Sequence, residues 1–195
     1  HRVDRRQRQM CIRDRSKYES LNKTKIWAMM ETPRGILNAV EIADCPELDG
    51  MVMGTNDLAK DLNVRFDSTR SPMLTALGLS ILAAKAAGII ILDGVFNAFK
   101  DDAGLMLEAV QGRDLGFDGK TLIHPAQVDI VNNVFSPSPT EIELAHRQIE
   151  AFKKASLNGE GVAVVDGKIV ENLHIETARA TIEKSEVILD MERTR

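Results

Sequence analysis

The sequence is poor in cysteine and has no long apolar run, and each absence excludes a class of protein. Its two cysteines, Cys11 and Cys45, form neither a disulfide framework nor a metal-ligand spacing, which predicts a reducing, cytoplasmic compartment. No apolar stretch approaches the ~20 residues of a membrane helix and none has the pattern of a secretory leader, so we expect no membrane partner. The formal charge of −4 gives no case for nucleic acid as a partner.

Positive charge is concentrated at one end of the sequence. Residues 1–15, HRVDRRQRQMCIRDR, contain six arginines and two aspartates and carry +4, which leaves −8 for the rest. Such a run is typical of a basic arm for nucleic acid or of a segment foreign to the fold. We favour the second interpretation, because MCIRD resembles the translation of a transposase adapter used in sequencing libraries. Residues 1–15 are therefore expected to be non-native, and the native N-terminal part to be missing.

Short apolar stretches alternate with helical patterns from about residue 24 onward. We predict strands at 25–30, 48–54, 89–94 and 117–125, helices at 35–44, 73–87 and 101–115, and a loop at 55–72. The repeated strand–helix order indicates βα units around a parallel sheet. Four such units are half of an eight-stranded barrel, so the predicted α/β fold of residues 16–135 is the C-terminal half of a (β/α)₈ TIM barrel. An open doubly wound sheet is the alternative, which the absence of a G-x-G-x-x-G motif disfavours.

Residues 136–195 differ in pattern and are predicted to form a C-terminal extension. We expect a helix that starts at Ser138 or Thr140 and runs to about Ser156, then a small hairpin over 162–170 and an amphipathic helix over 171–190. The dipeptide Asp166-Gly167 is a strong turn signal for the hairpin. The extension is expected either to pack on its own chain or to reach a neighbouring subunit.

Polar and turn-forming residues lie at or just after the carboxyl end of every predicted strand: Glu31; Asn56 and Asp57; Asp93 and Gly94; His124 and Pro125. In a parallel barrel these ends share the face on which active sites are built. The acids Glu31 and Asp57 would repel each other unless a cation lay between them, and their oxygens suit Mg²⁺, with Mn²⁺ as an alternative. Each residue also has a structural interpretation, as a helix cap, an Asx turn, a tight turn or a hydrogen-bonded histidine. The residues alone therefore indicate a metal-assisted α/β enzyme.

Seven ordered motifs between residues 24 and 190 resemble a known family: KIWAMMETPRGILNAVEIA, GTNDLAKDL, ALGLSILAAKAAG, ILDGVFNAFKD, QGRDLGFDGKTLIHPAQ, VFSPSPTEIELA and VDGKIVENLHIETAR. They are similar to the citrate lyase β-subunit-like CoA-ester lyases of the HpcH/HpaI aldolase superfamily, which include malyl-CoA lyase and citramalyl-CoA lyase. The resemblance implies a Mg²⁺-dependent lyase that reversibly cleaves a 3-hydroxyacyl-CoA thioester into an acyl-CoA and a 2-oxoacid. It also implies a homo-oligomer, a trimer or a hexamer, and an N-terminal half with basic CoA-binding residues that this sequence lacks.

The resemblance assigns roles to individual residues. Glu31 and Asp57 take the places of the metal ligands, and the turn formed by Gly54, Thr55 and Asn56 would present backbone N–H groups to the 2-oxoacid carboxylate. The loops with Asp93 and Gly94, and with Ile123, His124 and Pro125, would line the pocket and the CoA channel. Glu171, where many relatives have Asp, would reach a neighbouring subunit's site and act in proton transfer.

Four other interpretations remain open from the sequence. The same barrel and metal suit a thioesterase that hydrolyses malyl-CoA or citryl-CoA, or an aldolase acting on free 2-oxoacids. The arginine-rich start leaves a nucleic-acid-binding protein as a further alternative. A half barrel with open sheet edges leaves an inert fragment as the last.

Overall fold

The structure, a computed structural model, describes residues 24–65 and 67–194, and the basic segment 1–15 lies outside the described residues. The chain divides into two compact units, one ending at Phe135 and one starting at Ser136. Within the described ranges, no helix combines the length and the apolar character needed to cross a bilayer. The two units are described separately below.

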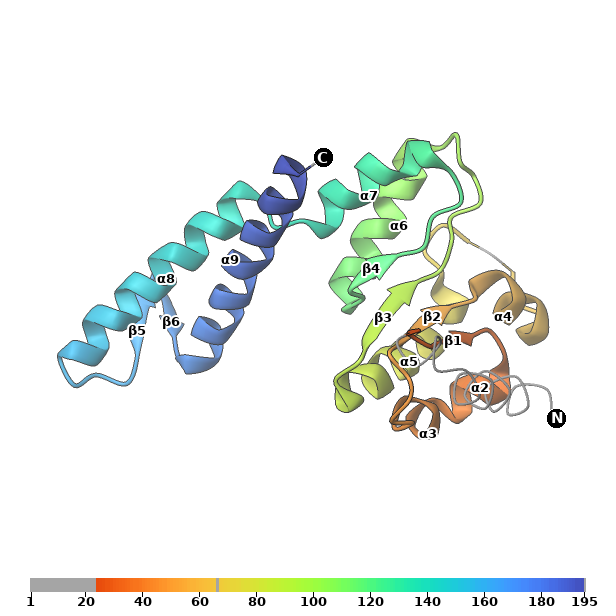
Figure 1. The fold of residues 1–195 in the computed structure, drawn as a ribbon, viewed down its shortest axis with the longest axis horizontal. Coiled ribbons are helices and arrows are strands. Elements are labelled where there is room, and N and C mark those ends of the chain that lie inside the picture. The colour runs from red at the N-terminus through yellow and green to blue at the C-terminus, as the bar shows by residue number, and fades with distance from the viewer. Residues whose placement is uncertain (1–23, 66, 195) are drawn as a thin grey trace. The chain divides into compact units, whose positions relative to one another are not determined.

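A parallel sheet forms the centre of the first unit, with the strand order β1-β2-β3-β4 (Figure 1). The strands are β1 (Trp27–Met30), β2 (Gly50–Met53), β3 (Ile90–Asp93) and β4 (Gly119–Lys120). Each pairs with its neighbour in parallel, and the register sets Met30 opposite Met53 and Asp93 opposite Lys120. The predicted α/β fold with a parallel sheet is confirmed. Among the described strands the sheet is open, since β1 and β4 each have one neighbour.

The helices that connect the strands begin and end at residues with clear local causes. The connections contain α2 (Pro33–Leu37), α3 (Ala39–Ala43), α4 (Thr55–Leu62), α5 (Leu74–Ala87) and α6 (Asp102–Leu115), with the 3₁₀ turn η2 (Ser71–Met73). After β4 follow a second 3₁₀ turn, η3 (Pro125–Gln127), and α7 (Val128–Phe135). Thr32 caps α2 by accepting a hydrogen bond from Gly35 N, and Asp101 caps α6 in the same way through Gly104 N. Gly88 ends α5 in the left-handed conformation.

Three predicted elements differ from the structure. Part of the predicted loop 55–72 is the helix α4. The helix forms because it buries Leu58 and Ala59 on one side, although the other residues of the segment are mostly polar. The predicted strand 117–125 is reduced to the two residues of β4, after which the chain turns into η3. The predicted helix 35–44 is divided at Asn38 into α2 and α3.

The main core lies between the sheet and the helices that cover it. Met30, Met51 and Met53 are almost completely buried, together with Leu77 of α5, as expected for thioether side chains that fill irregular space. Met29 is 54% exposed, because successive side chains of β1 point to opposite faces of the sheet and Met30 takes the buried face.

The second unit is a pair of helices joined by a hairpin, as the sequence indicated. Helix α8 (Pro139–Leu157) starts with a capping box formed by Ser138 and Glu141. The antiparallel strands β5 (Ala163–Val165) and β6 (Lys168–Val170) follow, and α9 (Asn172–Arg193) completes the unit. Both turn residues of the hairpin have positive φ, 51° for Asp166 and 73° for Gly167, as a type I′ turn requires.

Candidate functional site

Glu31 and Gly54 lie side by side at the carboxyl ends of β1 and β2. Met30 is paired with Met53, and Gly54 N donates a 3.0 Å hydrogen bond to Met30 O. A Cβ placed on Gly54 would lie 2.5 Å from Glu31 Cβ and 3.0 Å from Glu31 Oε2. The close approach of the Glu31 side chain therefore requires glycine at position 54.

The first turn of α4 brings three predicted site residues to the same edge. Thr55 is buried, while Asn56 and Asp57 are exposed. The acid in the first turn is favoured by the positive end of the helix dipole. Since Gly54 is the residue before α4 and contacts Glu31, the two predicted metal ligands come from neighbouring strand ends, as expected for a parallel sheet.

Glu31 and Asp57, the two predicted ligands, offer carboxylate oxygens, the type of donor that suits Mg²⁺. This ion is commonly held by one or two carboxylates, while water and substrate fill its other positions. Across the described ranges 24–65 and 67–194, no three or more His, Cys, Asp or Glu side chains gather as a protein cage for a metal. The residues therefore fit a hard cation with open positions and do not fit an enclosed structural zinc.

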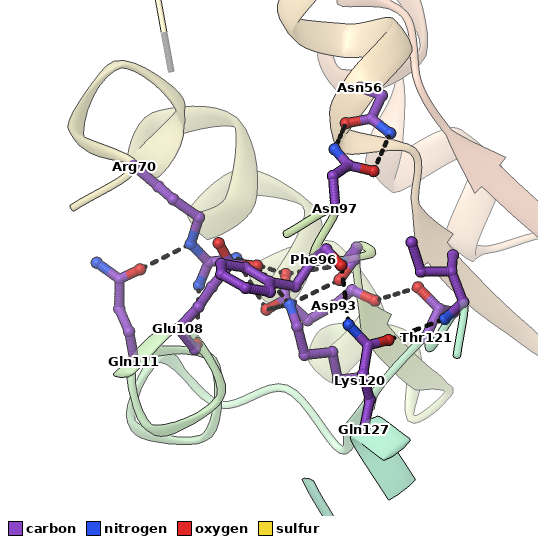
Figure 2. A network of polar contacts seen from close by, with 12 residues as sticks. Asn56, Arg70, Asp93, Phe96, Asn97, Glu108, Gln111, Lys120, Thr121 and Gln127 are labelled. Carbon is purple, nitrogen blue, oxygen red and sulfur yellow. Dashed lines mark hydrogen bonds and ion pairs between the residues drawn. The ribbon is translucent and has the colours of Figure 1, made fainter. Parts of the chain in front are cut away.

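The carboxylate of Asp93 lies at the centre of a buried group of charges, which we call the Arg70 cluster: Arg70, Asp93, Glu108 and Lys120 (Figure 2). Arg70 Nη1 is 2.8 Å from both Asp93 oxygens, and Lys120 Nζ is 3.0 Å from Asp93 Oδ2 and 2.6 Å from Glu108 Oε1. Asp93 and the Lys120 side chain are fully buried. Two cations and two anions cancel, which is the condition for keeping charges inside a protein.

This cluster changes the interpretation of Asp93 and adds residues that sequence analysis missed. The contact of Asp93 with substrate stays a prediction. In the described conformation the Asp93 carboxylate forms ion pairs with Arg70 and Lys120. Gly112 of α6 permits the arrangement, because a Cβ there would lie 2.8 Å from Asp93 Oδ2. A signal was available in the sequence, since a lysine inside a predicted buried strand requires an anionic partner.

A short loop stabilised by Asp67 presents Arg70 to the cluster. Asp67 Oδ1 accepts hydrogen bonds from Thr69 N and Oγ1, at 2.8 and 2.6 Å, and Asp67 Oδ2 accepts one from Ser71 Oγ at 2.8 Å. The bonds from the Thr69 and Ser71 side chains lower the pKa of Asp67 to about 2. Arg70 has a φ of 54°, a left-handed conformation that this bonded loop maintains.

The segment after β4 contains the predicted CoA-binding residues. Ile123 and His124 are exposed, and His124 Nδ1 accepts a 3.1 Å hydrogen bond from Ala126 N at the start of η3. The imidazole also stacks on Phe99, with ring centroids 4.9 Å apart. The histidine is therefore hydrogen-bonded, as its structural interpretation expected, and Phe99 is a neighbour that the sequence did not indicate.

Glu171 belongs to the second unit. It is the N-cap residue of α9, it is exposed, and its backbone N–H donates a 3.0 Å hydrogen bond to His174 Nδ1. Its predicted role in a neighbouring subunit stays a prediction.

The fold and the site define an α/β protein with acidic and polar groups along the carboxyl edge of a parallel sheet. The chain belongs to the HpcH/HpaI aldolase/citrate lyase family, whose model matches residues 3–125. The family predicted from the motifs is thus confirmed.

Two curated relatives and one solved structure illustrate the similarity. A (3S)-malyl-CoA thioesterase of Cereibacter sphaeroides (strain ATCC 17023) is 66% identical over 163 residues, which are 84% of this chain and 57% of the relative. Citrate lyase subunit beta of Escherichia coli (strain K12) is 36% identical over 84% of this chain and 55% of its own length. CitE of Mycobacterium tuberculosis, crystallised with magnesium, acetoacetate and coenzyme A, is 28% identical with a TM-score of 0.73, covering 86% of this chain and 63% of that one.

These similarities correct the predicted activity. Four relatives at 66% identity are named (3S)-malyl-CoA thioesterase, whereas citrate lyase subunits match at 36% or less, so the prediction of a lyase was wrong and the thioesterase alternative is favoured. The chain spans little more than half the length of these relatives.

Proposed function

We propose that this chain carries the site of a thioesterase that hydrolyses a malyl-CoA-type thioester. Water adds to the thioester carbonyl, the carbon–sulfur bond breaks, and the products are the free acid and the CoA thiol, which takes up a proton. The observation that carries the proposal is the apposition of Glu31 and Gly54 beside the turn that bears Asp57, in a chain 66% identical to malyl-CoA thioesterases.

Glu31 and Asp57 would hold Mg²⁺. When bound, the ion supplies a positive charge that orients an acyl carboxylate and polarises a carbonyl. The residues of the chain then bind and orient the substrate. The first N–H groups of a helix have no partner within the helix, so the start of α4 at Thr55 and Asn56 is suited to receive a carboxylate.

The remaining predicted residues complete the proposal. Ile123, His124 and Pro125, at an exposed segment after β4, would line the path of the CoA moiety. Glu171 would serve in proton transfer from a neighbouring subunit of a homo-oligomer. The sheet would form part of a (β/α)₈ barrel, which the TM-score of 0.73 with the CitE structure supports.

Product analysis tests the reaction. The complete product of the gene is incubated with (3S)-malyl-CoA and Mg²⁺, and free CoA thiol and malate are measured. We expect both in equal amounts, and their formation should stop when EDTA removes the metal. Glyoxylate and acetyl-CoA as the only products would refute hydrolysis.

Variants at the two acids test the site. Glu31→Gln and Asp57→Asn should each lower turnover by at least about 100-fold, because a bound metal contributes several kcal/mol to transition-state stabilisation. Each should also weaken Mg²⁺ binding measured by calorimetry. Asp61→Asn, an exposed acid on the same helix, is the matched control and should leave both unchanged. Equal Mg²⁺ binding in all three variants would refute the assignment of ligands.

A further inference from the structure

The loop of residues 94–101, between β3 and α6, is fixed at three points by side chains from other elements. Lys120 Nζ donates a 2.6 Å hydrogen bond to Gly94 O, and Gln127 Nε2 donates one of 2.9 Å to Phe96 O. The third point is the side chain of Asn97, which contacts Asn56 (Figure 2). Lys120 of β4 and Gln127 of η3 therefore bind backbone carbonyls of the loop, whereas Asn56 of α4 binds a loop side chain.

The first two attachments are buried and rigid. The Lys120 side chain is fully buried and belongs to the Arg70 cluster, so its position is set by Asp93 and Glu108. Gln127 is 1% exposed, and its Oε1 accepts a 3.0 Å hydrogen bond from Ile123 N. Since both donors are fixed, the backbone that precedes Asn97 has a defined path.

The contact between Asn97 and Asn56 is reciprocal. Asn97 Nδ2 donates to Asn56 Oδ1 at 2.7 Å, and Asn56 Nδ2 donates to Asn97 Oδ1 at 3.2 Å, across 41 positions of sequence. The loop and the helix also meet at Gly94, where an added Cβ would overlap Thr55 Oγ1. At the start of α4 the loop thus lies against Thr55 and is hydrogen-bonded to Asn56, and Asp57 is the next residue.

We propose that Asn97 is a positioning residue of this site: its carboxamide orients Asn56 and thereby fixes the first turn of α4, including Asp57. The proposal rests on the proposed function. Asn97 acts through Asn56 and has no assigned contact with the reacting groups. A carboxamide is required, because each partner must donate and accept at once.

Hydrogen exchange and kinetics on two matched variants test this role. Asn97→Ala removes the pair, while Asn133→Ala truncates an exposed asparagine of α7 and is the control. In Asn97→Ala we expect faster amide exchange in residues 55–62 and 94–101, with a melting temperature lowered by no more than about 2–4 °C. We also expect a five- to tenfold lower kcat/KM for malyl-CoA and weaker Mg²⁺ binding, as the loss of about one net hydrogen bond predicts.

A double mutant separates positioning from an independent role. If Asn97 acts through Asn56, adding Asn97→Ala to Asn56→Ala should cost nothing further in kcat/KM. Additive losses, or exchange rates in Asn97→Ala equal to those of the control, would overturn the proposal. If the proposed function is wrong, the unmutated protein itself will release no malate from malyl-CoA. In that case the role of Asn97 is still decided by amide exchange and by Mg²⁺ binding, each compared between Asn97→Ala and the control.

Discussion

Replacing Lys120 by methionine tests whether the Arg70 cluster supports the fold. The Lys120 ammonium makes three short contacts, to Asp93 Oδ2, Glu108 Oε1 and Gly94 O, and its side chain has no exposed surface. Methionine retains most of the volume of the lysine stem but removes the charge and every donor. The cluster then has one cation, Arg70, for two carboxylates.

The expected loss follows from these contacts. An unsatisfied buried carbonyl such as that of Gly94 costs about 1–3 kcal/mol, and removing one partner of a buried ion pair costs about 3–5 kcal/mol. Because Arg70 still holds Asp93 and Glu108 is 15% exposed, we expect a total of about 3–5 kcal/mol. Lys85→Met is the control. It breaks an ion pair with Asp118 at the surface, where the side chains are 45% and 35% exposed, and should cost less than about 1 kcal/mol.

Urea unfolding measured by tryptophan fluorescence reports on the first unit, because Trp27 on β1 is the only tryptophan. Lys120→Met should move the midpoint to much lower urea than Lys85→Met does. Adding Glu108→Gln restores the charge balance and should recover part of the loss. Equal midpoints for the two lysine variants would refute the argument that the buried charges depend on each other.

Two further predictions concern close packing and pH. Gly54→Ala should abolish Mg²⁺-dependent turnover, because the added methyl group would displace Glu31. The control Gly78→Ala, where an added Cβ has no atom within 4 Å, should leave turnover intact and raise the stability of its helix by about 0.5–1 kcal/mol. Thioester assays and thermal melts measure the two effects, and an active Gly54→Ala variant would contradict the packing argument. Arg147 lowers the pKa of Asp166 from its ordinary value of 3.8, so the ion pair stabilises the second unit above that pH and the effect is lost as pH falls through the lowered pKa. Asp166→Asn should therefore lower the melting temperature near neutral pH and have no effect in strong acid; an equal difference at both would exclude the ion pair as the cause.

Local patterns predicted the elements that depend on neighbouring residues. The apolar stretches became parallel strands, and Asp166-Gly167 formed the expected turn, because turn geometry and strand burial follow from residues close in sequence. Helix α4 was missed because its polar residues are typical of a loop. Its two buried positions, Leu58 and Ala59, gain their stabilisation from the tertiary core.

The residues at the strand ends do not determine which reaction is catalysed. Glu31 and Asp57 were predicted from the sequence as metal ligands, and such a pair of acids suits a lyase and a thioesterase acting on the same CoA ester equally well. The acids therefore could not distinguish carbon–carbon cleavage from hydrolysis, and it is the names of relatives at 66% identity that favour hydrolysis.

The sequence by itself determined the order of the parallel strands and the edge of the sheet at which polar groups meet. Only the tertiary structure decided which of these groups contact each other: Glu31 with Gly54, Asn56 with Asn97, and Asp93 with Arg70 and Lys120. The physical reason is separation along the chain, since the pairs to Asp93 join residues 23 and 27 positions apart. The spacing of apolar residues in a sequence indicates which face of a helix or strand a side chain occupies. It does not indicate which side chains from different elements come within hydrogen-bonding distance, because those distances are set only when the chain folds.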